Sequence, residues 1–238
     1  MRIGTSIRVA RCAYTRCAYL YFIVSIACLL ASPAFAQQWE VSLKSGPALT
    51  TFSGKLLSNA VYKWGHHFGF AAGGSVGFKF SNGVIPTVEL AYWDMGAQWS
   101  GTFIYVDDYR SHTIKSPFTA HYKLDYLITT LLVQYQFDTN WYVVPRISTG
   151  PSLAKNTRDV FVVESELTSE KGTLHVRSFD FGYTLAGGFD VNVGTAALFL
   201  EARYSIGLRN ILDEVGPDQE RTGTIKNTGA AVMGGIRF

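Results

Sequence analysis

Apolar and polar side chains alternate most regularly between Phe179 and Leu208. The positions of one parity up to residue 191 are Phe179, Phe181, Tyr183, Leu185, Gly187, Phe189 and Val191, and small or polar residues separate them. The alternation resumes after Val193-Gly194-Thr195 and continues to residue 208. A period of two predicts β-strands with one apolar face, so this stretch is expected to be a hairpin.

The two faces of this hairpin favour a membrane strand over a soluble one. Large aromatic residues cover the apolar face, whereas the other face mixes Gly and Ala with residues such as Asp190, Glu201 and Arg203. Strands of globular domains usually span about 5–6 residues, which is shorter than either arm here. Outer-membrane barrels use strands of about 9–11 residues that alternate apolar outside and polar inside.

Seven connections separate eight segments with this alternation. The predicted strands are 39–51, 68–80, 84–94, 121–137, 141–153, the two arms of the hairpin 179–208, and 224–238. In the fourth segment the apolar parity changes from Tyr122, Leu124 and Tyr126 to the opposite parity from Leu131 onward, which predicts a bulge near Leu127 or Ile128. The fold class is therefore predicted as all-β, an eight-stranded antiparallel up-and-down transmembrane β-barrel.

The lengths of the connections alternate as well. Short turns follow the second, fourth and sixth strands, whereas the long connections are 53–67, 95–120, 155–177 and 209–223. This alternation is typical of bacterial outer-membrane barrels, with both termini in the periplasm and long loops outside. β-branched residues around Ser169-Glu170-Lys171-Gly172 predict that the fifth and sixth strands continue as a hairpin beyond the membrane. The residues expected to form an aromatic girdle at the short-turn end are Trp39, Phe80, Phe137, Trp141, Phe189 and Phe238.

Residues 1–36 are predicted to be a secretory signal peptide, which leaves 37–238 as the barrel. Four arginines precede a short apolar run, and Ala34-Phe35-Ala36 provides the small residues that signal peptidase recognises. An uncleaved N-terminal anchor is the alternative. Cleavage removes all three cysteines, Cys12, Cys17 and Cys28, and changes the formal net charge from +3 to −1. The mature chain then offers no thiol chemistry and no argument for a nucleic-acid partner.

Charged residues occupy the predicted inner face. An eight-stranded barrel is wide enough only for side chains to fill it, and buried charges persist when they are paired. We therefore expect a lumen charge network that fixes the strand register. Its predicted members are Lys44, Lys79, Glu89, Arg146, Asp180, Glu201, Arg203 and Arg237, with Glu40 and Asp190 facing them.

Other chemistries have weaker support in the sequence. A proton or ion path through the charges would make a small pore. An outer-membrane lipid-modifying enzyme, a lipid A acyl hydrolase or acyltransferase, would need a nucleophile beside one of the histidines, which show no recognisable spacing. Adjacent His66 and His67 point apart on an extended strand, so no metal site or cofactor is predicted. A soluble ligand-binding barrel would fold without detergent.

Four segments resemble a known family. Residues 126–135 (Tyr-Leu-Ile-Thr-Thr-Leu-Leu-Val-Gln-Tyr), 145–153, 198–211 and the final Gly235-Ile236-Arg237-Phe238 are similar to strands of PorT-type, OmpX-like outer-membrane barrels. Thr129 and Thr130 stand where that family carries glutamate and proline. The resemblance implies a small barrel with one branch linked to protein secretion, and Ile236 and Phe238 as the assembly signal read by the barrel-assembly machinery.

Together these observations predict a non-enzymatic protein of the bacterial outer membrane. Its expected partners are outer-membrane lipids and lipopolysaccharide, the barrel-assembly machinery through the C-terminal strand, and an extracellular or secretion-system protein that binds the long loops. No nucleic acid is expected to bind.

Overall fold

The computed structural model describes residues 39–55, 64–107, 112–139, 141–165, 169–172, 176–212 and 224–238. The signal peptide predicted at 1–36 therefore lies outside the described residues. The strands are β1 (Trp39–Lys55), β2 (Trp64–Phe78), β3 (Val84–Asp107), β4 (His112–Gln136), β5 (Val143–Ser165), β6 (Ser169–Gly172), β7 (Phe179–Val193), β8 (Ala196–Gly207) and β9 (Thr224–Arg237). Within these ranges, no helix is long and apolar enough to cross a membrane.

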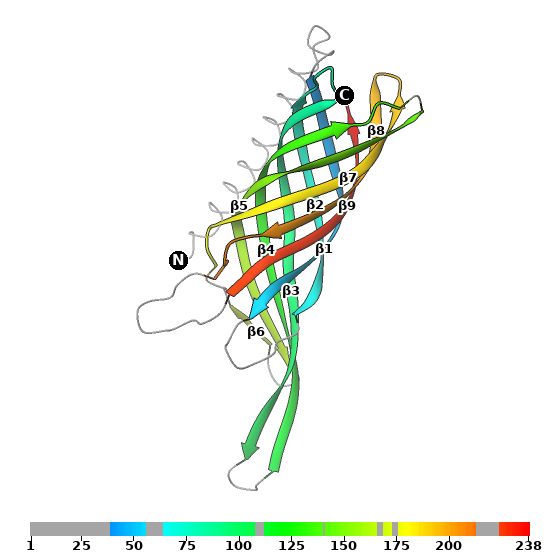
Figure 1. Ribbon diagram of the computed structural model, residues 1–238. Helices are drawn as coiled ribbons and strands as arrows, with labels where there is room; N and C mark the ends of the chain where they lie inside the picture. The colour runs from blue at the N-terminus through cyan, green and yellow to red at the C-terminus, as the bar shows by residue number, and fades with distance from the viewer. Residues whose placement is uncertain are drawn as a thin grey trace, which may run out of the picture.

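Eight of the strands close into a barrel (Figure 1). Each pairs antiparallel with its neighbours in the chain, β5 pairs directly with β7, and β1 pairs with β9 to complete the ring. The predicted eight-stranded antiparallel barrel is thus confirmed. The short β6 pairs with the far part of β5, from Phe161↔Gly172 to Glu164↔Ser169, and is not part of the ring.

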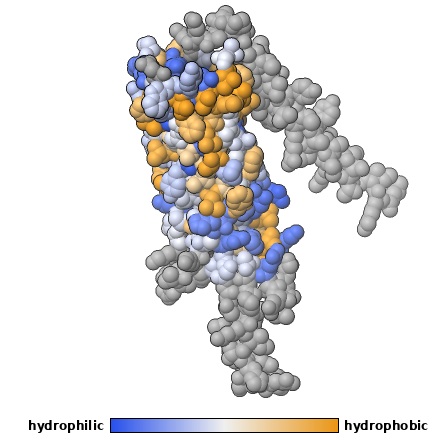
Figure 2. Space-filling model, turned by 90° about the vertical axis from the view of Figure 1, so that its right-hand side faces the viewer, coloured by the Kyte–Doolittle hydropathy of each residue, from blue (hydrophilic) through white to orange (hydrophobic). Residues whose placement is uncertain are grey.

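The apolar face of each strand points out of the barrel. In β8, Leu198 and Leu200 are 54% and 43% exposed, whereas Glu201 and Arg203, which follow them on the other face, are buried. The same alternation continues in the neighbouring strands, and Figure 2 shows orange side chains spread over the end that carries the short turns. The predicted orientation, oily residues outward and charged residues inward, is confirmed in this part of the barrel.

The exterior apolar belt has the height of a bilayer core. The exposed apolar side chains run from Leu127 on β4 to Phe137 directly after it, which matches the roughly 9–11 residues that a tilted strand needs to cross the hydrocarbon. At the short-turn end, the six residues expected to form the aromatic girdle are all exposed, with Trp141 at 79%. Tyr92 on β3, which pairs with Leu127, marks the opposite limit of the belt.

The predicted phase break in β4 is wrong. Tyr122, Leu124 and Tyr126 are buried on the same inner face as Ile128, and the β3–β4 register continues without interruption to Asp107↔His112. The irregularity lies in the partner strand, because the β4–β5 register shifts at Asp125/Tyr126 and leaves Thr157 as an extra residue in β5. Both faces of β4 carry apolar residues, and the inner ones fill the barrel near its long-loop end.

Two of the predicted long loops are largely strand. Residues 95–107 and 112–120 continue β3 and β4 as a paired hairpin, and the part beyond the last pairing with β2, Trp64↔Trp99, projects beyond the barrel (Figure 1). Likewise β5 extends to Ser165, and Ser169–Gly172 pairs back onto it. The predicted hairpin beyond the fifth strand is therefore confirmed, but the residues expected to form its turn are the returning strand.

The barrel interior has an apolar part near the long loops. Its members are Ala48, Phe52, Ala71, Ala91, Trp93, Met95, Ala97, Ala120, Tyr122, Leu124, Tyr126, Ile128, Ile211, Leu212, Ile225, Ala231 and Met233. Ile211 and Leu212 follow β8 and turn inward, where the Ile211 amide donates to the carbonyl of Ile225. The interior is therefore polar in only part of its length, and apolar side chains fill the part near the long loops.

Candidate functional site

The predicted charge network consists of two separate clusters in the described interior. In the first cluster, the Glu89 carboxylate on β3 accepts hydrogen bonds from both terminal nitrogens of Arg203 on β8, with Nη2–Oε2 at 2.7 Å. Lys44 on β1 places Nζ 2.5 Å from Glu89 Oε2 and 3.0 Å from Glu201 Oε1. Arg203 Nε also donates to Glu201 Oε1 at 3.1 Å. Two cations and two anions from three strands thus neutralise one another.

The second cluster contains Glu40, Arg146, Asp190 and Arg237. Arg146 on β5 donates to both oxygens of Glu40 on β1, at 2.7 and 3.2 Å, and its Nε lies 2.5 Å from Asp190 Oδ2. Arg237 on β9 also donates to Asp190 Oδ2 and stacks over the ring of Phe199 at 4.6 Å from the centroid. This cluster again holds two cations and two anions.

All of these charges except the half-buried Glu40 are buried. Glu89 is 0% exposed, Asp190 2% and Arg203 3%. Carrying a charge into such an interior costs several kcal/mol, and close pairing with good hydrogen bonds offsets that cost. Because every member has partners of opposite sign, neither cluster presents an unoccupied acid or base to a substrate. The arrangement favours a structural role, which is to link strands distant in sequence.

Two predicted members lie apart from the clusters. Lys79 follows the end of β2, is exposed, and makes no ion pair with any residue in the described ranges, so its assignment to the network is wrong. Asp180 is inward and buried as predicted, yet its contact is a hydrogen bond of 3.2 Å from Asn227 Nδ2 to Oδ2. Asn227 also donates to the Tyr126 hydroxyl at 3.0 Å, a polar group within the apolar half that sequence reasoning missed.

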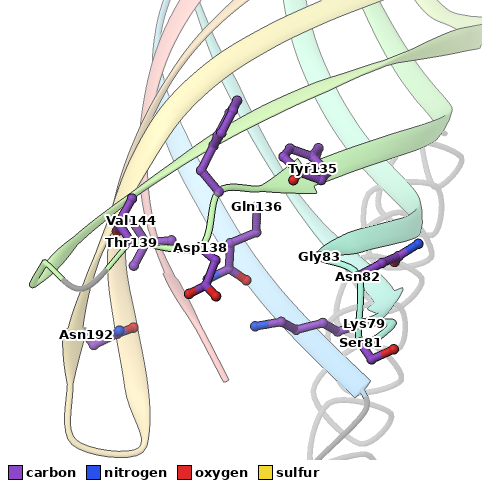
Figure 3. Close-up of a pocket in the computed structure, with 11 residues that line it drawn as sticks. Lys79, Ser81, Asn82, Gly83, Tyr135, Gln136, Asp138, Thr139, Val144 and Asn192 are labelled. Atoms are coloured by element: carbon purple, nitrogen blue, oxygen red, sulfur yellow. The ribbon is translucent and has the colours of Figure 1, made fainter.

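Lys79 lines a cavity of about 490 Å³ at the short-turn mouth of the barrel (Figure 3). Three turns converge there, and the side chains of Gln136, Asp138 and Asn192 surround the opening together with Lys79. Gln136 connects the mouth to the second cluster, since its Oε1 accepts a hydrogen bond from Arg146 at 3.2 Å. Strand parity does not reveal such a site, because turn residues follow no alternation.

The histidines do not assemble a hydrolase site in the part of the chain that the structure describes. His67 Nε2 lies 3.1 Å from Asp94 Oδ1, and His121 Nδ1 lies 3.1 Å from Gln98 Nε2. Neither ring has a serine or threonine hydroxyl as a hydrogen-bond partner among the described residues. The side chain of His112 and the whole of His175 lie outside those residues. No group of three or more His, Cys, Asp or Glu side chains in the described ranges is arranged to hold a metal ion.

Comparisons with known proteins give one family match and several structural matches. Residues 35–213 match the family described as Outer membrane protein beta-barrel domain. Neisserial surface protein A is 16% identical, with 84% of this chain and 95% of that chain covered and a TM-score of 0.40. OprG from Pseudomonas aeruginosa is 14% identical over 84% of this chain and 95% of its own, with a TM-score of 0.43. Ail of Yersinia pestis, in complex with the heparin analogue sucrose octasulfate, is 15% identical over 85% and 100%, with a TM-score of 0.36. A comparison with curated protein sequences gave no match.

Proposed function

The chain belongs to the family described as Outer membrane protein beta-barrel domain, and on that premise we propose a non-enzymatic envelope protein that binds through its long-loop end. Its barrel crosses the outer membrane, with the long-loop end outside and both termini in the periplasm. Its interior is sealed. The PorT-type, OmpX-like subfamily, with a role in binding, envelope organisation or secretion, is the finer assignment that the four resembling segments support.

The observation that carries this proposal is the division of the interior. Two neutral charge clusters occupy the short-turn half, and closely packed apolar residues occupy the other half. Trp93 and Met233 are 1% and 0% exposed within the apolar part. Ions that entered the mouth would meet no continuous polar path, because the apolar residues offer nothing to replace their hydration.

The long-loop end offers surface that a binding partner can reach. Beyond Asp94, β3 continues to Asp107, which corresponds to about 40 Å along the strand at about 3.3 Å per residue. β4 pairs with it over the whole of this length. Beyond Trp99, where the pairing with β2 ends, β3 and β4 form a two-stranded hairpin whose paired backbone lies far from the bilayer, where a protein partner can reach it.

We expect the refolded protein to produce no stepwise current in planar lipid bilayers. The neutral clusters and the apolar packing block hydrated ions, so current should remain at the level of protein-free bilayers at all tested voltages. Heat-modifiable mobility on gels would first establish that the refolded barrel is closed. Discrete channels whose ion selectivity changes in the variant Arg203→Met would contradict the sealed interior and favour the pore.

We expect an epitope inserted between Asp107 and His112 to be labelled by antibody on intact cells. The same epitope inserted between Gly194 and Thr195, in the tight turn after β7, should be labelled only after the outer membrane is permeabilised. The reverse pattern would contradict the proposed orientation.

A change in lipid A acyl chains on expression, abolished by His121→Ala, would contradict the non-enzymatic assignment.

A further inference from the structure

Cationic side chains gather on the barrel exterior just beyond the apolar belt. The β4–β5 register pairs Leu127 with Lys155 and, above the bulge, Asp125 with Arg158. One step further, Lys123 projects from the outer face of β4. The three cations Lys123, Lys155 and Arg158 therefore stand on adjacent positions of one seam. We call them the seam cations.

The belt ends directly at this seam. Leu127, Leu153 and Phe179 are 39%, 40% and 46% exposed, and Lys155 pairs with both Leu127 and Phe179 across its two neighbouring strands. Acyl chains must cover these apolar side chains in the membrane, since their exposure to water is unfavourable. The headgroup of the same lipid then lies at the level of Lys155 and Arg158.

Two acidic residues compensate the seam cations only in part. Lys123 Nζ lies 3.1 Å from Asp94 Oδ2, whereas Arg158 Nη1 approaches Asp125 Oδ2 only to 4.0 Å. The side chain of Arg158 is 61% exposed. Lys155 is exposed and makes no ion pair within the described part of the chain. Three cations against two anions leave an excess positive charge with free donors facing outward.

The opposite rim differs in charge. Its exterior carries exposed aromatic residues, among them Trp141 and Tyr142, and the described cation there, Lys79, lines the mouth cavity instead. Figure 2 shows hydrophilic side chains gathered below the orange side chains, on the side of the long loops, as well as at the short-turn end.

We propose that Lys155 and Arg158, with Lys123 beside them, bind a phosphate group of lipid A in the outer leaflet. Arginine offers a planar set of donors that matches phosphate oxygens, and lysine adds a mobile point charge. Acyl chains on Leu127, Leu153 and Phe179 place the headgroup phosphate within reach of both. The site rests on the proposed orientation and names the lipid that the long-loop end would recognise.

The test uses the refolded full barrel in detergent micelles with synthetic diphosphorylated lipid A, and native mass spectrometry as the readout of bound lipid. We expect wild type to retain lipid A and to lose at least about tenfold in affinity when the lipid is dephosphorylated, because charge-assisted hydrogen bonds are lost. The double variant Lys155→Ala/Arg158→Ala should show the same loss. Lys171→Ala, which removes an exposed cation on β6, should bind as wild type does.

Heat-modifiable mobility shows whether each variant has folded, so failure of the lipid site is distinguishable from failure of the barrel assignment. Wild-type affinity in the folded double variant would overturn the proposal. So would equal affinity for lipid A with and without phosphates, or an equal loss in Lys171→Ala. Equal retention of phosphatidylglycerol would overturn lipid A as the source of the phosphate.

Discussion

Substitution of Arg203 by alanine is expected to lower the free energy of unfolding by about 3–5 kcal/mol, the usual cost of breaking a buried ion pair from one side. Glu89 is fully buried and accepts two hydrogen bonds from Arg203, so the substitution leaves it with Lys44 as its remaining cation. Glu201 loses a hydrogen bond of 3.1 Å at the same time. Urea unfolding of the refolded protein in lipid vesicles measures the loss.

A double substitution separates the charge from the side-chain volume. Glu89→Gln combined with Arg203→Met removes one charge of each sign and leaves Lys44 and Glu201 paired at 3.0 Å. Because no buried charge is then left in excess, the loss should be smaller than in Arg203→Ala. A double variant that is less stable than the single one would show that the ion pair itself, rather than its neutrality, stabilises the barrel.

The second large effect is expected from Trp93→Ala, which should lower the free energy of unfolding by about 3–5 kcal/mol. Trp93 is 1% exposed and belongs to the apolar part of the interior, where its ring packs beside Gly229 of β9. The closed wall of strands cannot collapse into the space left by an indole, so most of the cavity would persist. The matched control is Trp141→Ala, since Trp141 is 79% exposed at the girdle. Equal losses of unfolding free energy in the two variants would contradict the packed interior.

The short-turn half of the barrel is predictable from sequence because lipid imposes alternation on it. In strands such as β8, small or charged residues alternate with apolar ones, so the parity of a position is enough to predict which side chains face outward. Near the long loops that contrast disappears. Tyr122 and Leu124 fill the interior, whereas Leu127 faces the lipid. If every apolar residue is assumed to face outward, these positions can be reconciled only by a bulge in β4, and β4 has none in its pairing with β3.

The parity of strand positions is not enough to predict which residues belong to the charge clusters. Asp180 and Asp190 share the inner face of β7, but ten positions of strand separate them by about 30 Å. Only Asp190 reaches the level of Arg146 and Arg237, and that level depends on the register of all eight strands. By its sequence position, Lys79 has the same parity as the inward-facing residues of β2. The strand ends at Phe78, however, and the Lys79 side chain turns into the mouth.

Each cluster joins the first strand to one of the last two strands. Lys44 meets Glu201 on β8, and Glu40 approaches Arg237 on β9 at 3.7 Å. A half-assembled sheet that lacks β9 therefore holds two carboxylates, Glu40 and Asp190, against the single guanidinium group of Arg146, and this uncompensated charge retains water. Docking of β9 against β1 supplies the missing cation, Arg237, and expels that water together, so completion of the circle and drying of the centre become a single event.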